Sequence, residues 1–168
     1  LFSIDPQKER LPSDFKIRPG IVIPADIYRY REYNMLLLSD QSAPTSGTVS
    51  LKTGEFYGGE KTSVNLGIAT TPKEGLKWGA GMDLSFVHLP AGDFISEIIE
   101  TDVAWAQTPT TFFQGLVQWD REDDNLGANL RFRWEYRPGS RFYFIVNPTH
   151  QKDKETYLLL AKLTGLWD

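Results

Sequence analysis

Apolar and polar residues alternate with a period of two along most of this chain, and helical spacing of apolar residues is almost absent. Such alternation is typical of a strand with one apolar and one polar face. The sequence therefore predicts an all-β protein. The pattern is plainest in residues 76–86, where one side of the predicted strand consists of Leu76, Trp78, Ala80, Met82, Leu84 and Phe86.

Short connections rich in Gly, Pro, Asn and Asp separate the alternating runs, which is the signature of hairpins. Neighbouring strands joined in this way pair antiparallel. We therefore predict an antiparallel up-and-down meander of about nine strands. Their ranges are 27–39, 47–57, 61–71, 76–88, 94–107, 111–120, 125–136, 141–147 and 156–167.

The first 26 residues contain several prolines and show no sustained alternation. We predict an irregular leading segment or an extracellular loop over residues 1–26, followed by β-barrel strands over residues 27–168. An alternative is a further strand over residues 15–23, although Pro19 and Gly20 disfavour a regular strand there.

Two architectures produce these amphipathic strands. A soluble ligand-binding barrel of the lipocalin type turns the apolar rows inward, whereas a membrane barrel turns them outward against lipid. The predicted strands are mostly 10 to 13 residues long. That length is close to a tilted span of a bilayer, while strands of soluble proteins are usually about five or six residues long. The lengths favour a transmembrane β-barrel.

Aromatic residues near both ends of the apolar rows also favour a membrane barrel, because interfacial girdles of Trp and Tyr flank its apolar band. By parity, Leu130, Phe132 and Leu163 point outward between them. The predicted lipid-facing girdle comprises Trp78, Phe86, Trp105, Trp119, Trp134, Tyr157 and Trp167.

The opposite rows mix glycine, amides and charges of both signs, as expected for a wet lumen. These charges could select a solute, or they could form a salt-bridged plug, and both interpretations stay open. Arg29, Arg31, Lys52 and Asp120 are assigned to the same inward side. The candidate lumen-facing charged residues are Lys77, Asp83, Glu100, Asp102, Arg131, Arg133, Glu135 and Lys162.

Composition excludes several other classes. A hydrophobic share of 40% with 13% aromatic residues argues against a disordered chain, and a net charge of −4 argues against a nucleic-acid binder. The chain has no cysteine. Asp83, Ser85 and His88 do not share one face, so they do not form a triad. The acidic run 120–124 is best interpreted as a solvated turn. We expect no catalysis, cofactor or metal.

Three stretches, 18–30, 55–59 and 115–140, carry a family resemblance. The last includes Gly115, Trp119, Asn125 and Trp134 and ends in Arg-Pro-Gly-Ser at residues 137–140. These stretches resemble the C-terminal barrel of the domain of unknown function 5916 family, whose members combine a carbohydrate-binding family 9-like domain with an outer-membrane barrel. The resemblance implies fold and location, and no reaction.

We therefore expect a porin-like protein of the Gram-negative outer membrane, in contact with its lipid, with a structural, transport or surface-anchoring role. Bacterial barrels use an even strand number. Nine strands therefore predict the C-terminal portion of a larger barrel, completed by upstream strands or by a partner chain at the edge of the first strand. Connections near residues 59, 91, 123 and 152 are expected outside the cell, and those near 42, 73, 109 and 139 in the periplasm.

Overall fold

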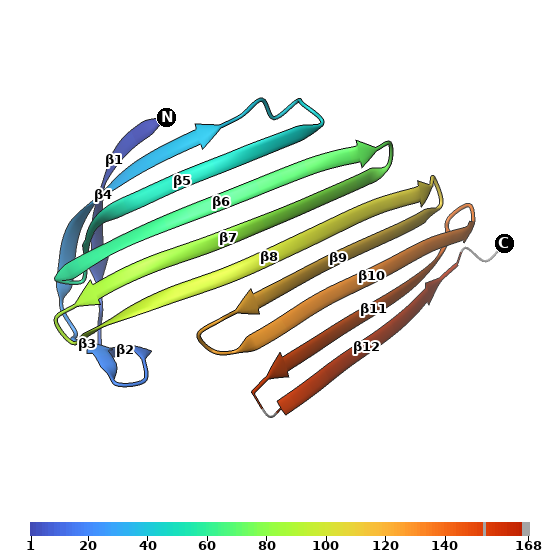
Figure 1. The fold of residues 1–168 in the computed structure, drawn as a ribbon. Coiled ribbons are helices and arrows are strands. Elements are labelled where there is room, and N and C mark those ends of the chain that lie inside the picture. The colour runs from blue at the N-terminus through green and yellow to red at the C-terminus, as the bar shows by residue number, and fades with distance from the viewer. Residues whose placement is uncertain (153, 166–168) are drawn as a thin grey trace.

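The computed structural model describes residues 1–152 and 154–165, and its secondary structure is entirely β (Figure 1). No helix in this part of the chain is long and apolar enough to cross a membrane. The strands are β1 (Phe2–Arg10), β2 (Phe15–Arg18), β3 (Ile21–Ile23), β4 (Ile27–Leu38), β5 (Thr45–Phe56), β6 (Gly59–Lys73), β7 (Leu76–Leu89), β8 (Gly92–Thr108), β9 (Thr111–Asp120), β10 (Asn125–Arg137), β11 (Ser140–Gln151) and β12 (Lys154–Thr164).

Ten strands form one antiparallel sheet in the order β1-β4-β5-β6-β7-β8-β9-β10-β11-β12, and β2 and β3 form a separate hairpin. From β4 onward each strand pairs with the next one in the chain. The nine predicted strands correspond to β4–β12, so the predicted all-β meander is confirmed.

The prediction that residues 1–26 are irregular is wrong for β1, which pairs antiparallel with β4 from Phe2 opposite Met35 to Arg10 opposite Ile27. Its apolar row is short and it contains Pro6, which hid the strand from the pattern. As the sheet's edge strand, β1 tolerates a proline because one side of its backbone needs no ladder partner. The alternative of one strand over 15–23 is also wrong, because β2 and β3 make a hairpin outside the main sheet.

With β1 included the sheet has an even number of strands, so the odd count no longer argues for further strands. The sheet is nevertheless open: among the described residues, β1 and β12 form its two edges and do not pair with each other. Within residues 1–152 and 154–165, no pairing between these edges closes the sheet into a ring. A proposal that places this sheet in a membrane therefore has to explain how its unpaired edges are satisfied. The number of strands no longer needs an explanation.

The connections fall into two groups at opposite ends of the strands (Figure 1). One end, which we call the hairpin end, carries connections 57–58, 90–91 and 121–124, the β11–β12 turn, and the β2–β3 hairpin. The far end carries connections 39–44, 74–75, 109–110 and 138–139. The tight turn at 74–75 requires a left-handed backbone, supplied by Gly75 with φ of 77°.

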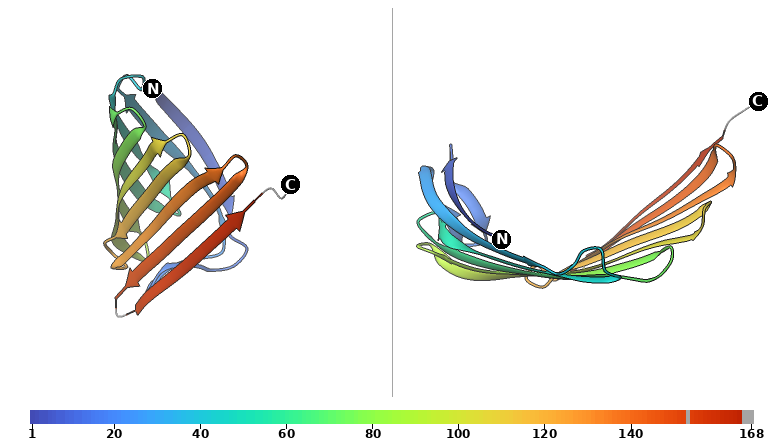
Figure 2. Two further views of the ribbon diagram at one scale, coloured as in Figure 1. Left: turned by 90° about the vertical axis from the view of Figure 1, so that its right-hand side faces the viewer. Right: turned by 90° about the horizontal axis from the view of Figure 1, so that it is seen from above.

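The sheet curls into a trough whose two edges rise on the same side, and the β2–β3 hairpin lies inside the trough (Figure 2). The hairpin contacts Val87 and Phe94, which are cross-strand partners and therefore share a face. That face carries the polar rows, so the polar face is concave. Gly54 permits the curl near β4, because a Cβ there would collide with the backbone carbonyl of Arg31.

The fold has almost no interior. Among the described residues the buried hydrophobic side chains are Ile23, Val87 and Leu89, and all three lie where the hairpin contacts the sheet. A soluble domain of this size normally buries most of the surface of its extended chain around a hydrophobic core. Here the large apolar side chains are displayed on a sheet surface instead.

Candidate functional site

The convex face is an apolar surface that continues across β4–β12. Cross-strand partners place all the predicted girdle residues on it, except that Trp167 lies outside the described residues. An aromatic row crosses four strands near the far end: ring centroids are 5.7 Å apart for Trp105–Phe113, 4.9 Å for Phe113–Phe132 and 6.3 Å for Phe132–Phe142.

Trp78 and Thr101, two residues of this surface with polar side-chain groups, hydrogen-bond to each other. Trp78 Nε1 donates to Thr101 Oγ1 at 3.0 Å, and the same hydroxyl donates to the carbonyl of Gly79 at 2.9 Å.

Trp78 and Phe86 lie on one strand about 27 Å apart at roughly 3.4 Å per residue. With the strand tilted by about 40°, this separation corresponds to about 21 Å along the membrane normal, so both aromatics lie near the borders of an apolar band about 25 Å tall.

Charged side chains on the convex face gather toward the hairpin end. Glu97, which parity places on this face, is paired with Arg121 of the β9–β10 turn, with 2.9 Å between Arg121 Nη1 and Glu97 Oε2. His88 and Asp93, cross-strand partners at the same end, also contact each other. The apolar surface is therefore bounded by a charged rim at the hairpin end.

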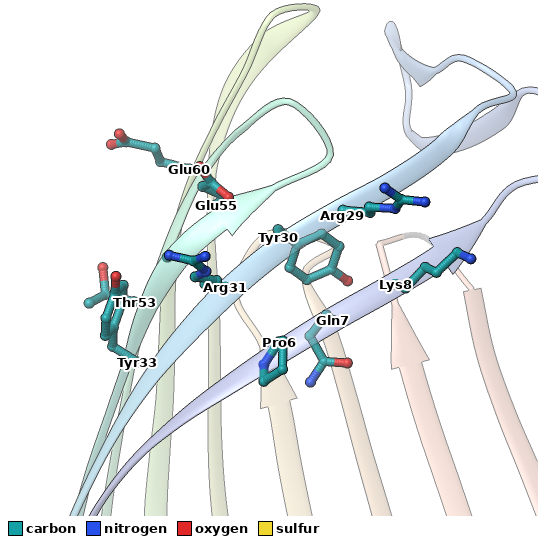
Figure 3. A pocket seen from close by; sticks show the side chains of 11 residues that line it. Pro6, Gln7, Lys8, Arg29, Tyr30, Arg31, Tyr33, Thr53, Glu55 and Glu60 are labelled. Carbon is teal, nitrogen blue, oxygen red and sulfur yellow. The ribbon is translucent and has the colours of Figure 1, made fainter.

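Part of this rim is a hollow of about 840 Å³ over β1, β4, β5 and β6 (Figure 3). Arg31 and Thr53 point to one side of the sheet there, and Tyr30 and Gln7 to the other. The inward assignment of Arg29 and Arg31 is therefore wrong, because the β4–β5 register puts both on the side of Tyr33 and Thr53. Strand β4 carries aromatic or aliphatic residues on both faces, so parity alone could not assign them.

The concave face holds all eight candidate lumen-facing charges, and it sorts them by sign. The acidic side chains Asp83, Glu100 and Asp102 lie on β7 and β8. Arg131, Arg133 and Lys162 lie on β10 and β12. Lys77 and Glu135 are the exceptions within these two regions.

These charges are not paired off against one another. Within the described part of the chain, Glu135 is the only one of the eight in an ion pair, with 2.9 Å between its Oε2 and Arg141 Nε. The acidic groups instead accept from neutral amides: Asn65 Nδ2 donates to Asp83 at 2.5 Å, and Gln118 Nε2 donates to Glu100 at 3.0 Å. Among the described residues, the charges on the concave face are therefore sorted by sign and are not joined into a salt-bridge network.

The β2–β3 hairpin covers the concave face at the hairpin end. Ile23 is only 2% exposed and packs with Val87 and Leu89. Arg18 lies 4.4 Å above the ring centroid of Phe94 and forms an ion pair with Glu122 of the β9–β10 turn. The hairpin thus connects β8 with the β9–β10 turn and narrows the trough at the hairpin end, which we call the mouth of the trough.

An aromatic cluster that includes Tyr28 and Tyr57 lies at the same end of the trough. The ring centroids of Tyr28 and Tyr57 are 5.0 Å apart, and Tyr57 Oη donates to Glu9 Oε2 at 2.5 Å. Burial, followed by this hydrogen bond, raises the pKa of Tyr57 above its ordinary value. Glu9 of β1 is thereby tied to the β5–β6 turn.

The other chemical candidates do not assemble into a site. Asp83 contacts Asn65, Ser85 exchanges a hydrogen bond with Ser63 at 2.8 Å, and His88 lies on the convex face beside Asp93. In the acidic run, Asp120 Oδ1 accepts the backbone N–H of Glu122 and of Asp123 at 3.0 and 3.3 Å. The Asp120 carboxylate therefore stabilises the β9–β10 turn.

No local pattern predicts the contact between Arg18 and Glu122, because Arg18 ends the short strand β2 and Glu122 lies in a turn far away in the chain. The register Arg133↔Tyr143↔Lys162 also needed the pairing of three strands. The charge patch that it creates could be found only once the sheet was aligned.

No protein-family model matches the chain, so the resemblance to the domain of unknown function 5916 family gains no support. No curated protein matches it either. A solved structure described as a KdgM porin in complex with disordered oligogalacturonate is similar, with a TM-score of 0.43 and 6% identity. The match covers 98% of this chain and 92% of that one. The chain is thus an open, curved, antiparallel β-sheet that shows a weak overall similarity to a porin.

Proposed function

We propose that this chain is the membrane-spanning part of a bacterial outer-membrane β-barrel, porin-like in form, with a transport, structural or surface-anchoring role and no catalytic one. A single observation supports this best: the continuous apolar surface is convex and exposed, while the polar and charged surface is concave. In hydrocarbon the convex surface contacts lipid, and the concave surface retains water.

The lipocalin-like alternative requires the reverse arrangement. An apolar ligand cavity would line the concave side, and the outward rows would be polar. Instead, Leu130, Phe144 and Leu159 are exposed on the convex side, with Asn129, Arg131 and Asn147 on the concave side. The membrane barrel therefore explains the orientation of the rows, which a soluble binding module does not.

The proposal includes a partner for each open edge. Unpaired N–H and C=O groups in hydrocarbon cost several kcal/mol each, so a lipid-embedded sheet must be closed. On β1, Phe2 and Ile4 lie on the convex side and Ser3, Asp5, Gln7 and Glu9 on the concave side. On β12, Tyr157, Leu159 and Leu163 lie on the convex side, while the concave side carries Lys162 and Thr164 together with Leu158 and Leu160. Further strands of the same protein, or of a partner chain, would continue the two surfaces without interruption.

The hairpin end is proposed to face the cell exterior. Long connections of bacterial barrels are extracellular and periplasmic turns are short. The longest connection within the sheet is residues 11–26, which carries β2 and β3 at the hairpin end. Connection 39–44 is the longest at the opposite end.

A cysteine-labelling experiment tests location and sidedness together, since the chain has no cysteine of its own. Lys152→Cys, in the β11–β12 turn, is expected to react with a membrane-impermeant maleimide on intact cells. Glu74→Cys, in the connection 74–75, is the matched control and is expected to react only after the outer membrane is permeabilised. Labelling of Glu74→Cys alone on intact cells would reverse the orientation, and labelling of neither variant would contradict surface exposure.

A further inference from the structure

A compact group of cations lies on the concave face near the far end. Arg133 is directly opposite Tyr143, which is directly opposite Lys162 on the next strand. Arg131 precedes Arg133 by two residues and therefore shares its face. We call Arg131, Arg133, Tyr143 and Lys162 the cationic patch.

Among the described residues, no carboxylate is paired with the cations of this patch. Within residues 1–152 and 154–165, no ion pair involves Arg131, Arg133 or Lys162. Glu135, which shares the face of Arg133 on β10, is already bound by Arg141. The concave residues opposite the two arginines on β9 are Phe112 and Gln114, which carry no charge.

The patch is also partly ordered without a ligand. The guanidinium carbon of Arg133 lies 5.3 Å from the ring centroid of Phe112, a cation–π contact that holds the group over the face of the sheet. Tyr143 between the two cations is half-buried and can donate a phenolic hydrogen bond. Two guanidinium groups, an ammonium and a phenol therefore converge on one surface.

Gathering three cations within about 10 Å on one face of a sheet is unfavourable unless an anion or solvent compensates for it. We propose that the cationic patch binds an oxyanion, the carboxylate or phosphate group of a solute in the trough. Arginine forks match the geometry of either group, and the lysine adds a point charge. This deepens the proposed function and rests on it in one respect, that the concave face borders water.

The acidic groups of β7 and β8 make the inference more specific. They share the concave face with the patch, and the concave β9 positions beside the patch, Phe112, Gln114, Leu116 and Gln118, are uncharged and separate the two groups. Asp120, at the hairpin end of β9, adds to the acidic side. An anion is therefore drawn toward β10–β12 and repelled from β7 and β8. A neutral solute is neither attracted nor repelled electrostatically by either region.

Equilibrium binding to the full chain, folded in neutral detergent micelles at low ionic strength, tests the proposal. Citrate and tripolyphosphate are the probes, with sucrose as the uncharged control, and heat is measured by titration calorimetry. Arg133→Gln is expected to weaken citrate binding about tenfold, the effect of losing one charge-assisted contact. Lys162→Gln should also weaken it. Lys52→Gln, with the same change of charge on the concave face of β5, should change it less than about twofold.

Equal weakening by Arg133→Gln and Lys52→Gln would mean general electrostatic attraction and would overturn the proposal. Failure of the wild-type chain to bind either anion better than sucrose would overturn it too. Circular dichroism of each variant excludes misfolding as the cause. These outcomes do not depend on membrane insertion. A chain that binds citrate at the patch but stays monodisperse without detergent would overturn the proposed function alone.

Discussion

A lysine at Leu130 is expected to lower the free energy of unfolding in a lipid bilayer by about 2 to 4 kcal/mol, the cost of a cation at mid-depth on a lipid-facing strand. Leu130 lies near the middle of β10, is 45% exposed on the convex face, and stands opposite Gly115 and Val146. None of these neighbours can pair with an ammonium group.

The adjacent Asn129 provides the matched control, because it points to the concave face and contacts Asn147 there. Asn129→Lys gives up that hydrogen bond, worth about 1 kcal/mol, but its ammonium remains in water. Unfolding by guanidinium chloride in phospholipid vesicles measures both variants. Equal destabilisation at these neighbouring positions would show that the two faces do not differ in environment.

Ile23→Ala is expected to weaken docking of the β2–β3 hairpin by about 2 to 5 kcal/mol, as for other buried isoleucines. Ile23 is 2% exposed among Val87 and Leu89, so truncation leaves a cavity that the sheet cannot readily fill. Because the hairpin has its own small sheet, the effect should be local opening and not global unfolding.

Trypsin cleavage after Lys16 reports this opening, since a docked hairpin is protected. Val22→Ala is the control: Val22 is adjacent in β3 but 41% exposed, and its truncation should leave the cleavage rate nearly unchanged. If both variants are cleaved at the wild-type rate, the hairpin is not held by its apolar contact with the sheet.

The strands β4–β12 were predictable because two independent local signals agree along them. The period-two alternation marks each strand, and residues such as Gly58 and Gly75, both with positive φ, mark the turns. Faces were predictable wherever one row is uniformly apolar, as in β7 and β10. In β4, where Tyr28 and Tyr30 on one face compete with Tyr33 and Met35 on the other, the alternation was ambiguous and Arg31 was misassigned.

Features that depend on contacts distant in sequence were not predictable. Strand β1 is recognisable only through its pairing with β4, because Pro6 and the charged residues after it resemble a loop. Docking of the hairpin depends on Arg18 meeting Phe94 and Glu122. The sorting of charges depends on the alignment of whole strands. The local sequence pattern was therefore sufficient to predict the meander. The docking of the β2–β3 hairpin and the cationic patch became apparent only in the tertiary structure.

The dependence of the purified chain on detergent bears most directly on its assignment to the membrane. With the apolar convex face of β4–β12 exposed, the chain should elute from size-exclusion chromatography as one defined species in detergent, and aggregate when detergent is removed. Transfer into lipid vesicles should restore a folded, protease-resistant sheet. A monodisperse, folded protein in buffer without detergent or lipid would contradict the assignment.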